Sequence, residues 1–177
     1  MDNSANPIQP DPDFLKSIQA GLRYWQSKTK RLSPEQMQWL DGRHKNLHQA
    51  IEFGLTQPGL WQDTVELLLQ TFDFSESGGY WPEWIPVLEK ALANAPKRKT
   101  LLHGRIQNRL GQLYRLDRRI QEAEEQHNEA LALADKIASD ELLLISYTCL
   151  AELKLTQKNV EQTRKFGKLG LALANAL

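Results

Sequence analysis

Residues 110–131 read LGQLYRLDRRIQEAEEQHNEAL, and this stretch decides the fold. Its small residues are Gly111, Ala123 and Ala130, and its large seam residues are Leu110 and Tyr114. Small side chains let two helices approach closely, while large apolar side chains fill the space between them. The apolar periodicity slips around Asp117, so the stretch predicts two antiparallel helices joined by a short turn.

The same spacing recurs on both sides of this stretch. About 39 residues earlier, the corresponding residues are Trp84, Leu88 and Ala91-Leu92, which follow Gly79-Tyr80-Trp81. About 40 residues later, they are Leu150-Ala151, Thr163, Gly167 and Gly170-Leu171. A two-helix unit that recurs at a nearly fixed period predicts units that stack and share a continuous core.

This spacing resembles the tetratricopeptide repeat, in which a Leu-Gly pair and a Tyr precede small residues on a second helix. The resemblance covers roughly residues 60–177, and His127 stands where an aromatic residue is usual. It implies an all-α protein, a right-handed α-solenoid of antiparallel helix hairpins with about eight helices. Three tetratricopeptide-like repeats are expected, at about 60–99, 100–139 and 140–177.

Further upstream, Trp39-Leu40, Asn46-Leu47 and Ala50 resemble the stretch that leads into the tetratricopeptide sensor arrays of NB-ARC-like and MalT-like bacterial signal-transduction ATPases. Arg43 stands where those sequences usually carry Glu. This resemblance implies an alternative function, as the sensor or oligomerisation fragment of a larger STAND-type ATPase or transcriptional regulator.

Residues that favour helices dominate the chain after the first dozen positions. Turn signals occur at Ser33-Pro34, Pro58-Gly59, Gly78-Gly79 and Ala95-Pro96. No segment alternates with the period of two that is typical of a half-buried strand. The expected helical segments are 13–30, 34–56, 60–76, 80–95, 100–116, 119–137, 140–156 and 159–177. Residues 13–59 would form an irregular N-terminal helical pair, and residues 1–12, rich in Pro, Asp and Asn, a disordered leader.

The composition excludes several classes of protein. The 177 residues include 22 Lys or Arg and 22 Asp or Glu, so the chain as a whole is not strongly basic. The single Cys149 cannot form an internal disulfide or a multi-cysteine zinc site, and it is typical of a reducing compartment. No apolar run approaches the roughly 18 residues of a membrane span, and no signal peptide is evident. A cytoplasmic protein without a membrane partner is expected.

Motifs for catalysis or cofactor binding are few. His44 and His48 share one helix face, as two metal ligands would, but the Glu of an H-E-x-x-H motif is missing. Surface histidines are therefore the favoured interpretation, and a metal-dependent enzyme the weakest alternative. Cys149 lies in the apolar run 142–150 and is expected to be a core residue rather than a nucleophile. We expect no catalytic residue, no metal and no cofactor, and hence no enzyme.

All five Trp lie in the first half of the chain, and Tyr80-Trp81-x-x-Trp84 stands at the expected start of a helix. Pro82 suits the first turn of that helix, whereas Pro86 predicts a bend or a later start. The rings are expected in the core between hairpins. The alternative is that one or two of them line a peptide groove.

Charge is segregated between two adjacent stretches. Residues 97–119 contain eight Lys or Arg and one Asp, whereas residues 121–141 contain seven Asp or Glu and one Lys. Most of these charges are expected to pair on the surface, each pair contributing roughly a few tenths of a kcal/mol. Nucleic-acid binding through 97–119 is a weaker alternative, because the acidic neighbour and the neutral total disfavour it.

The resemblance to tetratricopeptide folds places the first helix of each repeat along a concave groove. The side chains that it would bring there are Arg105, Asn108, Arg109, Gln112, Arg115, Thr148 and Glu152. Arg105 and Arg109 also resemble the Lys-x3-Arg pattern with which carboxylate-clamp repeats hold a peptide C-terminus, although Glu66 and Gln70 stand where those clamps use Asn. A non-catalytic module that binds a protein or peptide is implied, with an Arg-rich strip favouring acidic or carboxylate-bearing segments.

The last segment carries two stripes at helical spacing. The small residues Thr163, Gly167, Gly170 and Ala174 are expected to pack on 140–156, and Phe166, Leu169, Leu173 and Leu177 to face away. The ends of solenoids normally carry a polar face. An apolar stripe there predicts either further repeats or a homodimer formed through this helix.

Overall fold

The computed structural model describes residues 11–57, 59–96 and 100–177. Within these ranges the chain forms ten helices and no strand, which confirms the prediction of an all-α protein. The helices are α1 (Pro12–Lys28), α2 (Pro34–Asp41), α3 (His44–Thr56), α4 (Trp61–Gln70), α5 (Phe72–Ser77), α6 (Trp81–Ala93), α7 (Leu101–Leu116), α8 (Ile120–Ile137), α9 (Asp140–Thr156) and α10 (Val160–Ala174). None of these described helices is both long and apolar enough to cross a membrane.

Two of the eight predicted segments are each divided into two helices. Segment 34–56 is interrupted at Gly42, where α2 ends. Segment 60–76 is interrupted at Thr71, whose hydroxyl donates to the carbonyl oxygen of Leu67 at 2.9 Å. A Thr hydroxyl bonded to the preceding turn competes with the helical backbone and bends it. Because Thr also occurs inside continuous helices, the apolar spacing alone does not reveal this break.

Side-chain caps begin the first two helices. Asp11 accepts a hydrogen bond from the N–H of Asp13 at 2.9 Å, so α1 begins inside the expected leader, of which residues 1–10 lie outside the described part. At the start of α2, the N–H of Gln36 donates to the Ser33 hydroxyl at 3.3 Å, and the N–H of Ser33 donates to Gln36 Oε1 at 2.9 Å. This reciprocal pair is a capping box, which fixes the helix start that Ser33 and the Pro after it predict.

Three turns between paired helices share one backbone geometry. Gly79, Arg118 and Lys158 precede α6, α8 and α10, and their φ angles are 75°, 62° and 58°. In each turn the next residue donates its N–H to a carbonyl five residues earlier. The donors and acceptors are Tyr80 and Ser75, Arg119 and Tyr114, and Asn159 and Lys154, at 3.1, 2.8 and 2.9 Å. The motif recurs between paired helices at intervals of 39 and 40 residues, and it also ends α8 at Ala138, where φ is 50° and the N–H of Ser139 donates to the carbonyl oxygen of Ala134 at 3.0 Å.

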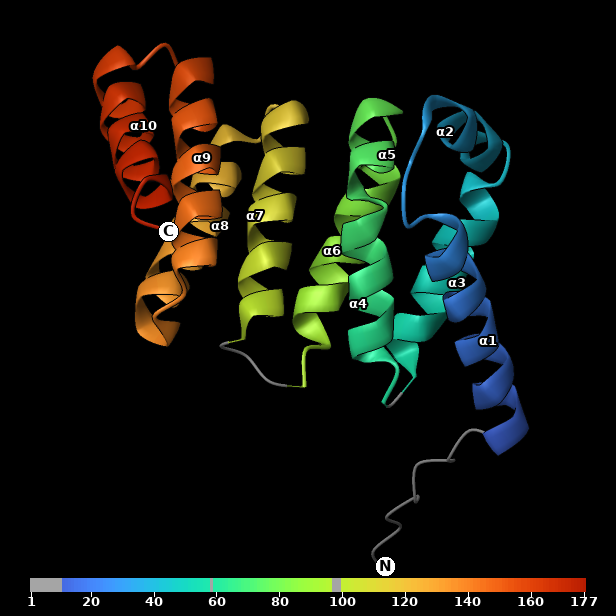
Figure 1. Ribbon diagram of the computed structural model, residues 1–177. Helices are drawn as coiled ribbons and strands as arrows, with labels where there is room; N and C mark the ends of the chain where they lie inside the picture. Colours follow the sequence, from blue (N-terminus) through green and yellow to red (C-terminus); the bar gives the residue numbers. More distant parts are fainter. Residues whose placement is uncertain (1–10, 58, 97–99) are drawn as a thin grey trace, which may run out of the picture.

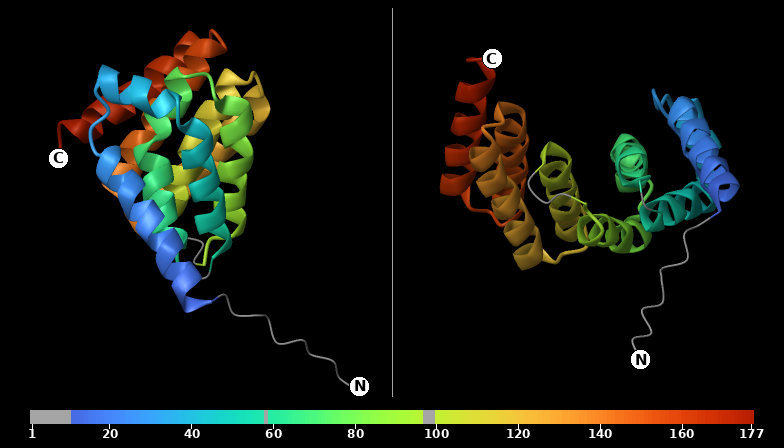
Figure 2. Two further views of the ribbon diagram at one scale, coloured as in Figure 1. Left: turned by 90° about the vertical axis from the view of Figure 1, so that its right-hand side faces the viewer. Right: turned by 90° about the horizontal axis from the view of Figure 1, so that it is seen from below.

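The helices follow one another in a curved row, with α1 at one end and α10 at the other (Figure 1). The pairs in close contact include α1 with α3 and α4, α4 with α7, α6 with α7, α7 with α8 and α9, and α9 with α8 and α10. Figure 2 shows α4 on the inner side of the curve and α3 and α6 on its outer side. The contacts thus join helices that are near one another in the chain, and α1 and α3 belong to the same row as the later helices.

Buried apolar side chains form a cluster that runs along this row from Leu22 of α1 to Leu153 of α9. Of the five Trp, Trp25, Trp61 and Trp84 are buried in the cluster, and Trp39 and Trp81 are half-buried against it. The Trp side chains therefore belong to the core. α6 begins at Trp81 and contains Pro86, so this proline does not delay the start of the helix.

The packing of α10 on α9 differs from the prediction. The ring of Phe166 stacks on Tyr147 with centroids 6.4 Å apart, although Phe166 belongs to the stripe expected to face away. Of the small residues, Gly170 is buried beside Tyr147, whereas Gly167 is exposed and a Cβ added to it would meet nothing within 4 Å. The face of α10 toward α9 thus includes both Phe166 and Gly170. Gly170 lies one turn after Phe166, and because it has no side chain it leaves room for Tyr147 of α9 beside the Phe166 ring.

Candidate binding groove

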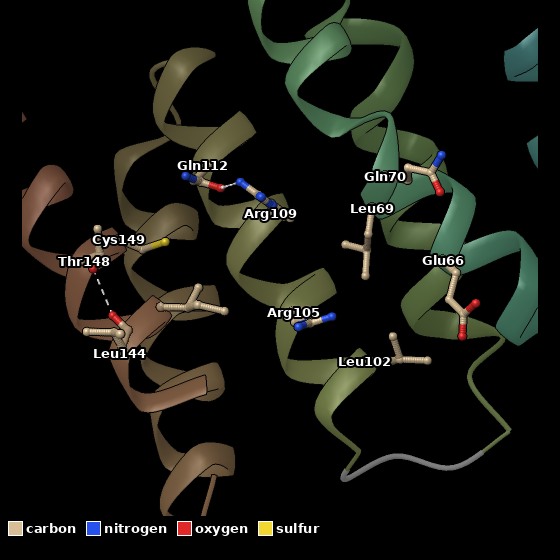
Figure 3. Close-up of a pocket in the computed structure, with 11 residues that line it drawn as sticks. Glu66, Leu69, Gln70, Leu102, Arg105, Arg109, Gln112, Leu144, Thr148 and Cys149 are labelled. Carbon is tan, nitrogen blue, oxygen red and sulfur yellow. Dashed lines mark hydrogen bonds between the residues drawn. The ribbon is translucent and has the colours of Figure 1, made fainter. Parts of the chain in front are cut away.

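A groove of about 590 Å³ lies between α4, α7 and α9 (Figure 3). Its lining residues are Glu66, Leu69 and Gln70 of α4, Leu102, Arg105, Arg109 and Gln112 of α7, and Leu144, Ile145, Thr148 and Cys149 of α9. The four predicted site residues among them are Arg105, Arg109, Gln112 and Thr148. Three helices that are separate in sequence therefore supply one continuous surface.

The spacing within α7 assigns its polar and apolar residues to different faces. Arg105, Arg109 and Gln112 follow at intervals of four and three, so they share the face toward the groove. Ile106 and Leu113 are not exposed at all, and they lie about a quarter turn away, in the core. The amphipathic pattern of α7 thus fixes which side chains the groove receives.

The floor of the groove is apolar. Leu69, Leu102, Leu144 and Ile145 are half-buried, and each retains apolar area that a ligand could cover. Covering such area contributes roughly 25 cal/mol per Å². The sequence interpretation missed these residues, although Leu102 stands three residues before Arg105 and Leu144 four before Thr148. At these spacings on a helix, neighbours share a face.

Arg105 projects from α7 and forms an ion pair with a carboxylate of α9. Its Nη2 contacts Oε1 of Glu141, and the two side chains are 37% and 50% exposed. An ion pair this exposed contributes less than about 1 kcal/mol. Arg105 is therefore accessible to a second carboxylate, and Glu141 competes with that carboxylate only weakly.

Arg109 is oriented by contacts that leave its charge available. Its Nη1 donates to Oε1 of Gln112 at 3.0 Å, and its guanidinium lies 4.3 Å from the centroid of the Phe72 ring (Figure 3 shows the hydrogen bond). Its Nη2 is 3.9 Å from Oδ1 of Asp73, too far for a hydrogen bond. The ring and the amide hold the guanidinium in place, so an incoming carboxylate meets a pre-oriented donor.

The structure does not place the other three predicted site residues in the groove. Asn108 is fully buried: its Nδ2 donates to the Ser146 hydroxyl at 2.9 Å, and its Oδ1 lies 3.0 Å from Nδ1 of His127. Arg115 and Glu152 lie 3.8 Å from each other across α7 and α9. The α7 side chains of Asn108 and Arg115 thus contact residues of α8 and α9 rather than α4. They join neighbouring helices instead of facing a ligand.

Glu66 and Gln70 of α4 point in different directions. Gln70 donates through Nε2 to the carbonyl oxygen of Gln26 at 2.9 Å and to the hydroxyl of Thr29 at 2.7 Å, so its amide joins α4 to α1, although the side chain also forms part of the groove lining (Figure 3). Glu66 is exposed and accepts a hydrogen bond from Gln62 at 3.1 Å. The α4 wall thus presents a carboxylate across from the arginines of α7.

The described cations of the basic stretch pair only partly with the acidic stretch: Arg105 contacts Glu141, whereas Arg109 and Arg115 lie near Asp73 and Glu152, outside 121–141. Beyond the pairs already described, Arg119 bonds Glu122 and Lys154 bonds Glu124 at 2.5 Å. Hydrogen bonds from these cations lower the pKa of both carboxyl groups. Residues 97–99, the most basic part of the stretch, lie outside the described residues. These ion pairs reduce the positive charge that the described part of the basic stretch presents to solvent.

Burial holds Cys149 and His127 in their neutral forms. It raises the pKa of the Cys149 thiol to about 12 and lowers the pKa of His127 to about 4. The thiolate is the nucleophilic form of cysteine, so at neutral pH Cys149 acts as a core residue.

His44 and His48 join α3 to the start of α6. Nδ1 of His44 lies 2.8 Å from the carbonyl oxygen of Asp41, and its ring stacks on Tyr80 with centroids 4.5 Å apart. Nε2 of His48 lies 3.1 Å from the carbonyl oxygen of Glu83. In the described ranges no three or more His, Cys, Asp or Glu side chains are placed to hold a metal ion.

No protein-family model matches the sequence, and no curated protein matches it either. The likeness to tetratricopeptide repeats therefore rests on the residues and spacings quoted above, and the family stays a prediction.

Proposed function

We propose that the chain is a non-catalytic module that binds a peptide segment of another protein in the groove between α4, α7 and α9. The observation that carries the proposal is the pair of arginines, Arg105 and Arg109, one turn apart beside an apolar floor. A segment with an acidic side chain or a terminal carboxylate next to an aliphatic one matches both features. The carboxylate would lie against α7, and the aliphatic side chain against Leu102 and Leu144.

The spacing of the turns at Gly79, Arg118 and Lys158, each inside one of the expected hairpins, supports a tetratricopeptide-like organisation. So does the order of the contacts, since the first helices α4, α7 and α9 succeed one another and enclose the groove. On this proposal the chain is a right-handed solenoid of hairpins whose inner surface binds the partner.

Binding would exchange one ion pair for another at Arg105. The incoming carboxylate displaces Glu141, which is half exposed and returns to water. At Arg109 the carboxylate adds hydrogen bonds without displacing a bonded one, since Asp73 is 3.9 Å away. Glu66 on the opposite wall disfavours a segment that is acidic along its whole length and favours one with a cation or amide donor on that side.

The test begins with peptides selected from a random library displayed on phage against the wild-type chain. We expect the selected peptides to be enriched in Asp or Glu next to Leu, Ile or Val. Their affinities are then measured by fluorescence anisotropy for the wild type and for the double variant Arg105→Ala/Arg109→Ala. The double variant should bind at least about tenfold more weakly, which is about 1.4 kcal/mol.

The matched control is Arg23→Ala/Lys136→Ala, which removes the same charge from exposed positions of α1 and α8, outside the groove. It should leave the affinity unchanged at physiological salt. Equal loss in the two double variants would mean that only net charge matters. Unchanged affinity in the Arg105→Ala/Arg109→Ala variant, with its circular dichroism intact, would place the binding site elsewhere.

A further inference from the structure

One side of α10 is open to solvent although it carries large apolar side chains. Val160 is 58% exposed and Leu171 64% exposed, and Leu155 at the end of α9 is also 64% exposed. Arg164, Gly167 and Ala174 lie on the same side of α10 and are exposed as well. We call this surface the α10 face; its residues are Leu155, Val160, Arg164, Gly167, Leu171 and Ala174.

The chain itself shows what covers such a surface. The residues that stand 40 positions earlier on α8 are Ile120, Glu124, His127, Leu131 and Ala134. Each of them is half or fully buried, and α9 packs against α8. His127 and Ala134 are not exposed at all, whereas their counterparts Gly167 and Ala174 are. The α10 face is thus the position at which a helix analogous to α9 would pack.

Charge distinguishes the two surfaces. On α8, Glu124 accepts hydrogen bonds from Lys154 at 2.5 Å and from Gln157 at 3.2 Å, and the Lys154 side chain is only 12% exposed. On α10, the counterpart of Glu124 is Arg164, which has the opposite sign. A helix that covers the α10 face in the manner of α9 must therefore carry a carboxylate where α9 carries Lys154.

We propose that the α10 face binds an amphipathic helix of another protein that has a carboxylate opposite Arg164 and aliphatic side chains opposite Val160 and Leu171. This surface is separate from the groove, and the proposal does not depend on the function assigned to the groove.

A second copy of the chain fits the α10 face poorly. A symmetric contact between two α10 faces offers Arg164 no carboxylate, because Arg164 is the one charged residue among the six that form the face. The helix at the other end of the row, α1, carries Lys16, Arg23 and Lys28 and a single carboxylate, Asp13, which is bonded to Lys16. Like charges across an interface are unfavourable, so a negatively charged helix is the matching occupant.

The probe is a synthetic peptide of residues 139–156, the sequence of α9, with Lys154→Glu, labelled with a fluorophore and kept reduced. The unchanged α9 peptide is its control. Anisotropy with the full chain should give an affinity at least about tenfold higher for the Lys154→Glu peptide than for the control. In the chain variant Arg164→Glu, which restores the charge found on α8, the preference should reverse.

Two further measurements complete the test. Leu171→Glu, at an exposed position, should abolish binding of the Lys154→Glu peptide while thermal unfolding of the chain is unchanged. Sedimentation of the chain alone should give a monomer. The proposal is overturned if neither peptide binds, or if both bind equally to the wild type. It is also overturned if Arg164→Glu does not change binding, which is the result expected of a peptide that displaces α9 from its own place in the chain. Dimerisation of the chain through Leu171 would overturn it as well.

Discussion

In the first half of the row, Trp84 belongs to a core of large apolar side chains, whereas His127 in the second half contacts a polar side chain and packs against a glycine. Trp84, Phe72 and Leu88 are completely buried, and they stabilise the first half mainly by the apolar area that they remove from water. In the second half, Asn108, His127 and Ser146 are just as buried but are polar.

Hydrogen bonds make the second arrangement possible. Asn108 donates to Ser146 and lies 3.0 Å from His127, so α7, α8 and α9 are joined by one polar chain. The ring of His127 occupies the space beside Gly111, where a Cβ would come within 2.6 Å of it. The region around Trp84 thus depends mainly on volume, whereas the region around His127 also depends on protonation and on its close contact with Gly111.

The largest expected effect is in the first half. Trp84→Ala removes a fully buried indole and should lower the free energy of unfolding by about 3–5 kcal/mol, because the cavity cannot collapse completely. Urea titration at pH 7 followed by circular dichroism measures it. Trp84→Phe is the matched control: it keeps most of the volume and removes an indole N–H that is buried without a described partner. An equal loss of unfolding free energy in Trp84→Ala and Trp84→Phe would contradict the dependence of the first half on side-chain volume.

Low pH should lower the free energy of unfolding through His127, in the second half of the row. The pKa of His127 is lowered from 6.5 to about 4, mainly by burial and then by Arg115, so the folded state favours the neutral ring. Its contribution is complete above pH 6.5 and is lost as the pH falls from 6.5 to 4. Between pH 7 and 4.5 the wild type should lose about 2–3 kcal/mol more of its free energy of unfolding than His127→Gln, which cannot titrate there.

Urea midpoints of the wild type and of His127→Gln at pH 7 and 4.5 measure this difference. Carboxylates that also titrate in this range, including Glu124, are present in both proteins, so their effect cancels in the comparison. Equal losses in the wild type and in His127→Gln would show that the ring has access to water or to a partner that stabilises its charged form. The distinction between the two halves would then rest on packing alone.

A smaller effect should distinguish two helical glycines whose surroundings in the structure differ. Gly111 and Gly21 are each followed three residues later by Tyr, but a Cβ at Gly21 would meet nothing within 4 Å. Gly111→Ala should cost about 1–3 kcal/mol because the ring of His127 must shift. Gly21→Ala should instead stabilise the chain by about 0.5–1 kcal/mol, the helix propensity difference. Thermal melts of the two variants compare them directly, and equal signs would contradict the close approach of α7 and α8.

The comparison also shows which features a single sequence can and cannot specify. The helix start at Ser33 and the turn at Gly79 were predictable, because a cap and a flexible residue act through neighbours in the chain. The turns at Arg118 and Lys158 have no glycine, and only the lost periodicity marks them. The break at Thr71 was missed, since it depends on one hydroxyl bond to the preceding turn.

For the groove, the resemblance to tetratricopeptide folds grouped Arg105, Asn108, Arg109 and Gln112 on one face of α7, and all of these except Asn108 line the groove. It could not separate Asn108 from them, because the burial of Asn108 depends on Ser146 and His127, which are 38 and 19 residues away. Partners this distant in sequence are not visible in a periodicity. The orientation of Gln70 toward α1 was hidden for the same reason.

The smallest expected effect concerns Glu141 at the groove. It distinguishes two roles of Glu141, which either competes with a bound carboxylate for Arg105 or positions Arg105 for binding. If Glu141 competes with a bound carboxylate for Arg105, Glu141→Gln should raise the affinity of a selected acidic peptide about two- to threefold, since an exposed pair contributes under about 1 kcal/mol. Glu125→Gln changes the net charge equally at an exposed site on α8, outside the groove, and should leave the affinity unchanged. Anisotropy at about 0.15 M salt resolves the two, because screening suppresses long-range effects of net charge but not the contact at Arg105. A loss of affinity in Glu141→Gln would mean that Glu141 holds Arg105 in its binding orientation, and the carboxylate of the partner would then be assigned to Arg109 alone.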